Sequence, residues 1–184
     1  MTQIEQLRDA IAASAVLTDP QVGDGFVFGK AHLSAANIDV NVNVDPELED
    51  QVEIDADMLI AAIEQVLEMP TEAWRQIVDG IAEEVEDAVG DQEVIEKTDL
   101  RDDLSICSVV IFADAILLSF AAPKQFPDSW IRAQLGVALE VEGVSVDEKD
   151  GIETVEFDTL ENLLDHLTSD DGSDEIANTH NNGS

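Results

Sequence analysis

The stretch LSICSVVIFADAILLSFAAP, residues 104–123, decides the fold, because its twenty residues carry one charged side chain, Asp114. Its length matches a transmembrane helix, but an Asp in the middle of a membrane costs about 2.5–3.5 kcal/mol. The tripeptide Ala113-Asp114-Ala115 divides the stretch into two halves of strand length that are rich in Val, Ile and Ser. We therefore predict a buried β-hairpin and not a membrane span.

Further strands are predicted on both sides of this hairpin. Apolar residues alternate with other residues throughout 130–141, which indicates one long strand, followed by a bend at 142–143. Upstream, the alternation of Ile and Val with Asp and Asn over residues 38–44 is typical of a half-buried strand. Residues 26–28 indicate another strand, and residues 19–25 a turn or linker.

The N-terminal segment has the pattern of a helix. Residues 2–17 carry apolar side chains at helical spacing, and Thr2 and Glu5 are placed like a capping box. The segment lacks a basic region before its apolar residues, so we interpret it as a helix of the mature protein and not as a signal peptide.

Two amphipathic helices are predicted in the middle of the chain. The first spans residues 59–67 and stops before Pro70, and the second spans 71–90. Thr71 is the expected N-cap of the second helix, and Gly90 its end. The short connection at Pro70 predicts a helical hairpin.

The predicted fold class is α+β: a curved antiparallel sheet covered by the helical hairpin, with N- and C-terminal helices. Residues 152–157 indicate a strand, and Leu160, Leu163, Leu164 and Leu167 indicate a short helix after it. We expect a single domain over residues 1–167, with the N-terminal helix (1–18) at its periphery. Residues 168–184 are polar and repetitive, which predicts a disordered acidic tail.

The net charge limits the classes of partner. The chain has 42 acidic residues against 8 Lys and Arg, a formal net charge of −34. Binding to nucleic acid or to an anionic membrane needs clustered Lys and Arg, so neither partner is expected. The charge is uneven: residues 45–103 have 21 acids and three bases, a net of −18, whereas residues 104–139 have a net charge of zero. Strands as apolar as those of 104–139 need cover on both faces, from helices or from a second copy of the chain.

Carboxylates are the first place to look for a metal site. Asp99, Asp102 and Asp103 together, or Glu83 with Asp87 one helical turn apart, could gather a divalent ion. Alignments to an EF-hand loop at Gly151 and at residues 41–52 both fail, because required ligand or Gly positions are wrong. Solvated surface acids are the simpler interpretation, so we predict no metal, cofactor-binding or catalytic residue.

The remaining reactive side chains give no enzyme signature. His32, His166 and His180 have no spacing typical of a zinc site. Cys107 lies in the most apolar stretch without a basic neighbour, so we expect a buried, unreactive thiol in a reducing, cytoplasmic compartment. No GxSxG, Walker-type or GxGxxG motif is present.

The two tryptophans are expected to serve packing. Trp74 falls on the inward stripe of the second amphipathic helix, and Trp130 opens the predicted long strand at a rim of the core. Neither position by itself indicates a binding anchor.

The order of elements between residues 40 and 146 resembles that of uncharacterised bacterial cytoplasmic α+β domains, a family of unknown function. The resemblance depends on Trp74-Arg75-Gln76-Ile77-Val78 and on Leu104-Ser105-Ile106. It implies a fold and a cytoplasmic location, and no activity or functional residue.

Three functions remain open from the sequence. The first is a non-enzymatic interaction or regulatory module whose acidic surface binds a basic protein partner. The second is a domain whose acidity serves solubility or a high-salt cytoplasm and has no specific partner. The third is a metal-dependent enzyme that uses clustered carboxylates. A homodimer through residues 104–139 is compatible with each of them.

Overall fold

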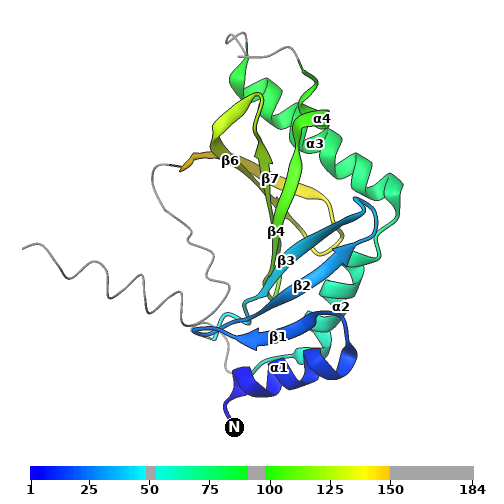
Figure 1. The fold of residues 1–184 in the computed structure, drawn as a ribbon, viewed down its shortest axis with the longest axis vertical. Helices are drawn as coiled ribbons and strands as arrows, with labels where there is room; N and C mark the ends of the chain where they lie inside the picture. The colour runs from blue at the N-terminus through cyan, green and yellow to red at the C-terminus, as the bar shows by residue number, and fades with distance from the viewer. Residues whose placement is uncertain (49–52, 91–97, 150–184) are drawn as a thin grey trace, which may run out of the picture. The chain divides into compact units, whose positions relative to one another are not determined.

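Seven strands form one open sheet in which every strand lies beside its neighbour in the sequence (Figure 1). The computed structural model describes residues 1–48, 53–90 and 98–149. The strands are β1 (Thr18–Val22), β2 (Val27–Leu33), β3 (Ile38–Val44), β4 (Ser105–Ile111), β5 (Ile116–Ala122), β6 (Phe126–Leu135) and β7 (Val141–Glu148). Together with the helices they make an α+β fold, as predicted.

The sheet is mixed and not wholly antiparallel as predicted. Strands β3 and β4 pair in parallel, whereas the other five neighbouring pairs are antiparallel. Between β3 and β4 the chain forms α2 (Ala56–Leu67), α3 (Thr71–Val89) and α4 (Leu100–Asp103). A parallel pair requires a long crossover of this kind, because the chain must return to the end of the sheet from which it left.

The hairpin predicted for residues 104–123 is confirmed. Its strands are β4 and β5, and Phe112 N–H donates to Ala115 O at 2.9 Å across the turn that contains Asp114. The single strand predicted over 130–141 is wrong, since β6 ends at Leu135 and β7 begins at Val141. A turn separates them, in which Gly136 N–H donates to Glu140 O and Leu139 has a φ of 64°. The alternating sequence pattern continues across this turn and therefore hides it.

Two smaller predictions near the N-terminus and α3 also need correction. Thr18–Val22, where a turn or linker was expected, is strand β1, and it tolerates Pro20 because it is an edge strand. Thr71 is the first residue of α3 and not its N-cap; Pro70, in an extended conformation, holds the cap position without a side-chain hydrogen bond.

The predicted ends of two helices are confirmed. Helix α1 (Gln3–Ser14) begins with the capping box, in which Thr2 and Glu5 each bond the other's backbone N–H. The backbone N–H and the hydroxyl of Thr2 both donate to Glu5 Oε2, and these two hydrogen bonds lower the pKa of Glu5. Gly90 is the C-cap of α3, with a φ of 58° that suits glycine.

The helices pack on different parts of the sheet (Figure 1). Helix α2 contacts α1, β2 and β4, whereas α3 contacts β7 and α4. The closely packed helical hairpin of the prediction is therefore not confirmed.

One face of the sheet forms the core. Along β5 every second side chain is buried, and Ile116, Leu118 and Phe120 share this face with buried partners on β4 and β6. The buried side chains of α1, α2 and α3 join the same cluster. On the second face of β5, Leu117, Ser119 and Ala121 are half-buried. The sequence predicts that both faces of these strands are covered. In the structure the core face is fully buried, and the second face is only partly buried.

The remaining predictions on the C-terminal part fall outside the described residues. These are the strand at 152–157, the helix at 158–167, the tail at 168–184, and the positions of His166 and His180. Within the part of the chain that the structure describes, no helix combines the length and apolar character needed to cross a membrane.

Candidate functional site

A cleft of about 520 Å³ lies between α3, the turn from β2 to β3, and the start of β4. We call it the α3–β4 cleft. Its lining is largely apolar, with two arginines and one aspartate among polar groups. The residues that line it are Ala35, Ala36, Ile38, Thr71, Trp74, Arg75, Val78, Asp79, Arg101, Leu104, Ser105 and Ile106.

The cleft exists because β3 and β4 pair over only part of their lengths. Their parallel register runs from Asn41 beside Ser108 to Val44 beside Ile111. The first residues of each strand have no partner in the other, and Figure 1 shows the two strands diverging toward these ends. The β2–β3 turn and the start of β4 therefore form opposite walls of the cleft.

Trp74 contributes the largest side chain of the lining. Its ring stacks on Phe120 of β5 with a centroid separation of 5.9 Å and an interplanar angle of 24°. Phe120 is fully buried, whereas Trp74 is half-buried and faces the cleft. The packing role predicted for Trp74 is thus confirmed, and the same ring offers an apolar surface to a ligand.

Arg101 is the centre of a cluster of ion pairs beside the cleft. Its Nε lies 3.0 Å from Asp79 Oδ1, and its Nη1 lies 3.2 Å from both Glu86 Oε1 and Asp99 Oδ1. Glu83 Oε1 lies 4.0 Å from Nη2. The hydrogen bond that Arg101 donates to Asp99, followed by the one that it donates to Asp79, raises the pKa of Arg101. The cluster fixes α4 against α3 and so sets one wall of the cleft.

Asp99 has a second bond to the same residue. Its Oδ1 accepts the backbone N–H of Arg101 at 3.0 Å and caps α4. This hydrogen bond, together with the side-chain bond from Arg101, lowers the pKa of Asp99. Asp99 is therefore a capping residue and not a free ligand.

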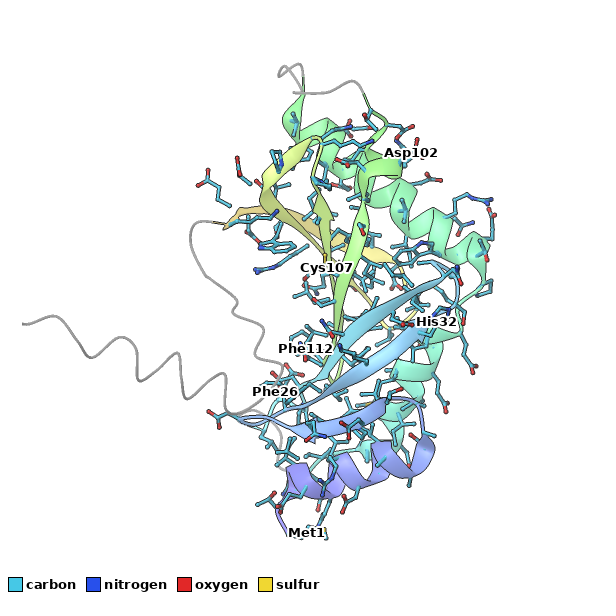
Figure 2. All side chains as sticks on the ribbon, viewed as in Figure 1. Met1, Phe26, His32, Asp102, Cys107 and Phe112 are labelled. Carbon is cyan, nitrogen blue, oxygen red and sulfur yellow. The ribbon has the colours of Figure 1, made fainter. Side chains whose placement is uncertain are left out.

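The three acids considered as a metal site do not converge. Asp99 faces Arg101, and Asp102 is exposed (Figure 2). Asp103 is 5 % exposed and accepts the backbone N–H groups of Lys124 and Gln125, each at 2.9 Å, on one carboxylate oxygen. Asp103 therefore holds the turn between β5 and β6.

The Glu83 and Asp87 pair has no third ligand among the residues that the structure describes. Glu83 lies near Arg101 and Asp87 is exposed. Among the described residues, no group of three or more His, Cys, Asp and Glu side chains is arranged to hold a metal ion.

Neither His32 nor Cys107 belongs to the cleft lining, and the two residues lie apart from each other (Figure 2). His32 Nδ1 lies 2.8 Å from Asp39 Oδ1 on the exposed surface of β2 and β3. Cys107 is half-buried and not buried as expected, because the β4–β5 register shifts between Ile106 and Ser108. Its Sγ lies 3.5 Å from Ser105 O.

Helix α3 presents the strongest local charge near the cleft. Its sequence contains six acidic residues and one basic residue, while Ile77, Ile81, Ala82 and Val85 are buried against the core. We call the six acids the α3 acidic surface: Glu72, Asp79, Glu83, Glu84, Glu86 and Asp87.

Sequence reasoning identified Trp74 and the acidity of α3, but not the roles of Arg101 or Asp103. Arg101 is one of three bases among 21 acids in residues 45–103, and this isolation is a usable signal for an ion-pair centre. Asp103 has no comparable signal, because its exposed neighbour Asp102 is chemically identical.

Comparison of the chain with protein-family models, with curated proteins and with solved structures gives no significant match.

Proposed function

We propose that this protein is a non-enzymatic interaction module whose α3 acidic surface binds a basic protein partner. The observation that carries the proposal is the arrangement of charge on α3. Its buried side packs on the sheet, and Glu72, Glu83, Glu84, Glu86 and Asp87 are exposed to solvent. Exposed carboxylates on a rigid helix produce a directed negative potential that steers a cationic partner.

Arg101 organises part of this surface without neutralising it. Its side chain is 29 % exposed, and its guanidinium pairs with Asp79, Glu86 and Asp99 at hydrogen-bond distance. One positive charge shared among these carboxylates leaves the cluster negative. Arg75 pairs with Glu72 at 2.9 Å on the same helix. The arginines therefore hold the acids in place, and the surplus charge remains available to a partner.

The first prediction concerns the location of this binding surface. We expect Glu83→Gln, Glu84→Gln and Asp87→Asn together to weaken binding of poly-L-lysine by about tenfold at low salt, because three surface charge contacts contribute about 0.5 kcal/mol each. The control neutralises three exposed acids of α2 and its C-cap, by Asp57→Asn, Glu64→Gln and Glu68→Gln. Isothermal titration measures both affinities.

Equal losses in the two triple variants would contradict a binding surface on α3. A fold that unfolds below molar KCl, followed by circular dichroism, would instead favour the salt-adapted domain without a specific partner. A thermal-melt screen with Mg²⁺, Mn²⁺ and Ca²⁺ tests the metal-dependent enzyme, which requires one ion to raise the midpoint beyond an ionic-strength control.

We also propose that the chain forms a homodimer through the sheet region 104–139. Val110, Leu117 and Trp130 are half-buried on the second face of the sheet, where the sequence has no net charge. The Lys149 ammonium lies 4.6 Å from the Trp130 ring centroid at the same face. Contact through this face would bury apolar surface and keep the α3 acidic surfaces away from the interface.

The second prediction tests this interface. We expect the wild-type protein to sediment as a dimer and Leu117→Lys as a monomer, because a charge would enter an apolar contact. Met58→Lys, on the exposed surface of α2 and outside residues 104–139, is the matched control and should remain dimeric. A monomeric wild type at concentrations of about 100 μM would contradict the homodimer.

A further inference from the structure

We propose that the α3–β4 cleft binds an extended segment of the basic partner, which pairs with the free edge of β4 and inserts an apolar side chain against Trp74. This inference rests on the proposed function, since the α3 acidic surface brings the partner to the cleft. It adds the conformation that the partner adopts and the side-chain class that it must carry.

The first support is the edge of β4 at Ser105 and Ile106, which among the described residues has no neighbouring strand on the β3 side. Ser105 and Ile106 pair with β5 on one side, but the β3 register begins only at Ser108. Ile38 and Val40 of β3 likewise pair with β2 alone among the described strands. A strand edge without a neighbour presents backbone donors and acceptors that an extended peptide can satisfy. The edge lies inside the cleft, since Ser105, Ile106 and Ile38 line it.

The second support is the apolar interior of the cleft. Trp74, Val78 and Leu104 are half-buried and line it. Because Trp74 is held by its stack on Phe120, the ring is fixed before a ligand arrives and little entropy is lost on binding. In an extended peptide every second side chain points to the same side, so a segment lying along β4 can direct one apolar side chain to this ring.

The third support is the charge around the cleft, which selects a basic segment. Six carboxylates lie on α3, and Asp99 and Asp102 lie at the start of α4 beside it. Arg75 and Arg101 also line the cleft, but each is already paired with a carboxylate. Lys or Arg side chains flanking the apolar residue would therefore meet surplus negative charge, whereas an acidic segment would be repelled.

The test uses the chain of residues 1–184 and three synthetic peptides of equal charge. The first is acetyl-Lys-Leu-Lys-Val-Lys-Leu-Lys-amide, which alternates basic and apolar residues. The second has Ser in place of each apolar residue. The third has the sequence of the first, but the backbone nitrogen of each of its three apolar residues is methylated. Because the N–H groups of alternate residues point to the same edge of an extended peptide, this removes the donors along one edge. Trp130→Phe leaves Trp74 as the fluorescent reporter in the cleft, and Trp74→Phe leaves Trp130 as the reporter outside it.

We expect the first peptide to shift the Trp74 emission to shorter wavelength with a saturable isotherm, and to leave the emission of Trp130 unchanged. The Ser peptide and the N-methylated peptide should each bind about tenfold more weakly, since the first lacks the apolar anchor and the second lacks strand pairing. Ala36→Phe, which places a ring in the mouth of the cleft from the β2–β3 turn, should weaken the first peptide by at least about tenfold. Circular dichroism checks that this variant is folded.

The outcomes separate this inference from the proposed function. If all three peptides bind equally well and Ala36→Phe has no effect, the cleft is not the site, although the acidic surface still binds basic chains. If only the Ser peptide is weakened, an apolar anchor operates without strand pairing and the inference of an extended partner is overturned. If no peptide binds at low salt, both the proposed function and this inference are wrong.

Discussion

Phe120→Ala is expected to lower the free energy of unfolding by about 3–5 kcal/mol, because truncating a fully buried aromatic ring leaves a cavity that its neighbours fill only in part. Phe120 has no exposed surface and lies between Ile106 and Ile131 in the sheet register. It also supports Trp74 of α3 from below the cleft. The loss therefore weakens both the sheet core and the attachment of α3.

Phe28→Ala is the matched control for this change. Phe28 lies in β2 and is 36 % exposed, so removing its ring should cost about 1 kcal/mol or less. Urea unfolding followed by far-UV circular dichroism measures both variants without relying on the fluorescence of Trp74. A Phe120→Ala variant as stable as Phe28→Ala would contradict the packing described for the core.

We expect Asp103→Ala to lower the free energy of unfolding by about 3 kcal/mol. The variant removes a buried carboxylate and leaves the backbone N–H groups of Lys124 and Gln125 without their acceptor. Gln125 also donates from its side-chain Nε2 to Thr98 O, so the turn between β5 and β6 is tied to the segment around α4 at two points. Loss of the hydrogen bonds to Asp103 should make this turn more mobile.

Two further variants identify the cause of the loss. Asp103→Asn keeps an oxygen that can accept both N–H groups, so it should cost less than Asp103→Ala. Asp102→Ala removes the exposed neighbouring acid and should change stability by about 0.5 kcal/mol at most. Hydrogen exchange of the Lys124 and Gln125 amides should accelerate in Asp103→Ala alone; unchanged exchange there would contradict the assigned role.

Local sequence patterns were sufficient for the elements whose signals are short in range. The alternation over residues 38–44 predicted β3, and the apolar stretch broken by Asp114 predicted the β4–β5 hairpin. Thr2 and Glu5 predicted the start of α1, because a capping box depends only on residues three apart. The same approach failed where a pattern continued across a turn, as at Gly136 between β6 and β7.

The candidate site was predictable only in its parts. Helical spacing placed Trp74 on the buried side of α3, and composition located the acidic region. The sequence contained no signal for the cleft, because its walls come from the β2–β3 turn and the start of β4, about 70 residues apart in the chain. Its shape depends on where the parallel register begins, at Asn41 and Ser108.

The sequence by itself determined the class of the fold, the positions of most helices and strands, and the net charge of −34. These properties follow from composition and from contacts between residues close in the chain. The tertiary structure alone decided the parallel pairing of β3 with β4, the divergence that opens the cleft, and the different roles of Asp102 and Asp103. The physical reason is that burial and hydrogen bonding of each group depend on distant segments, whose register no local pattern specifies.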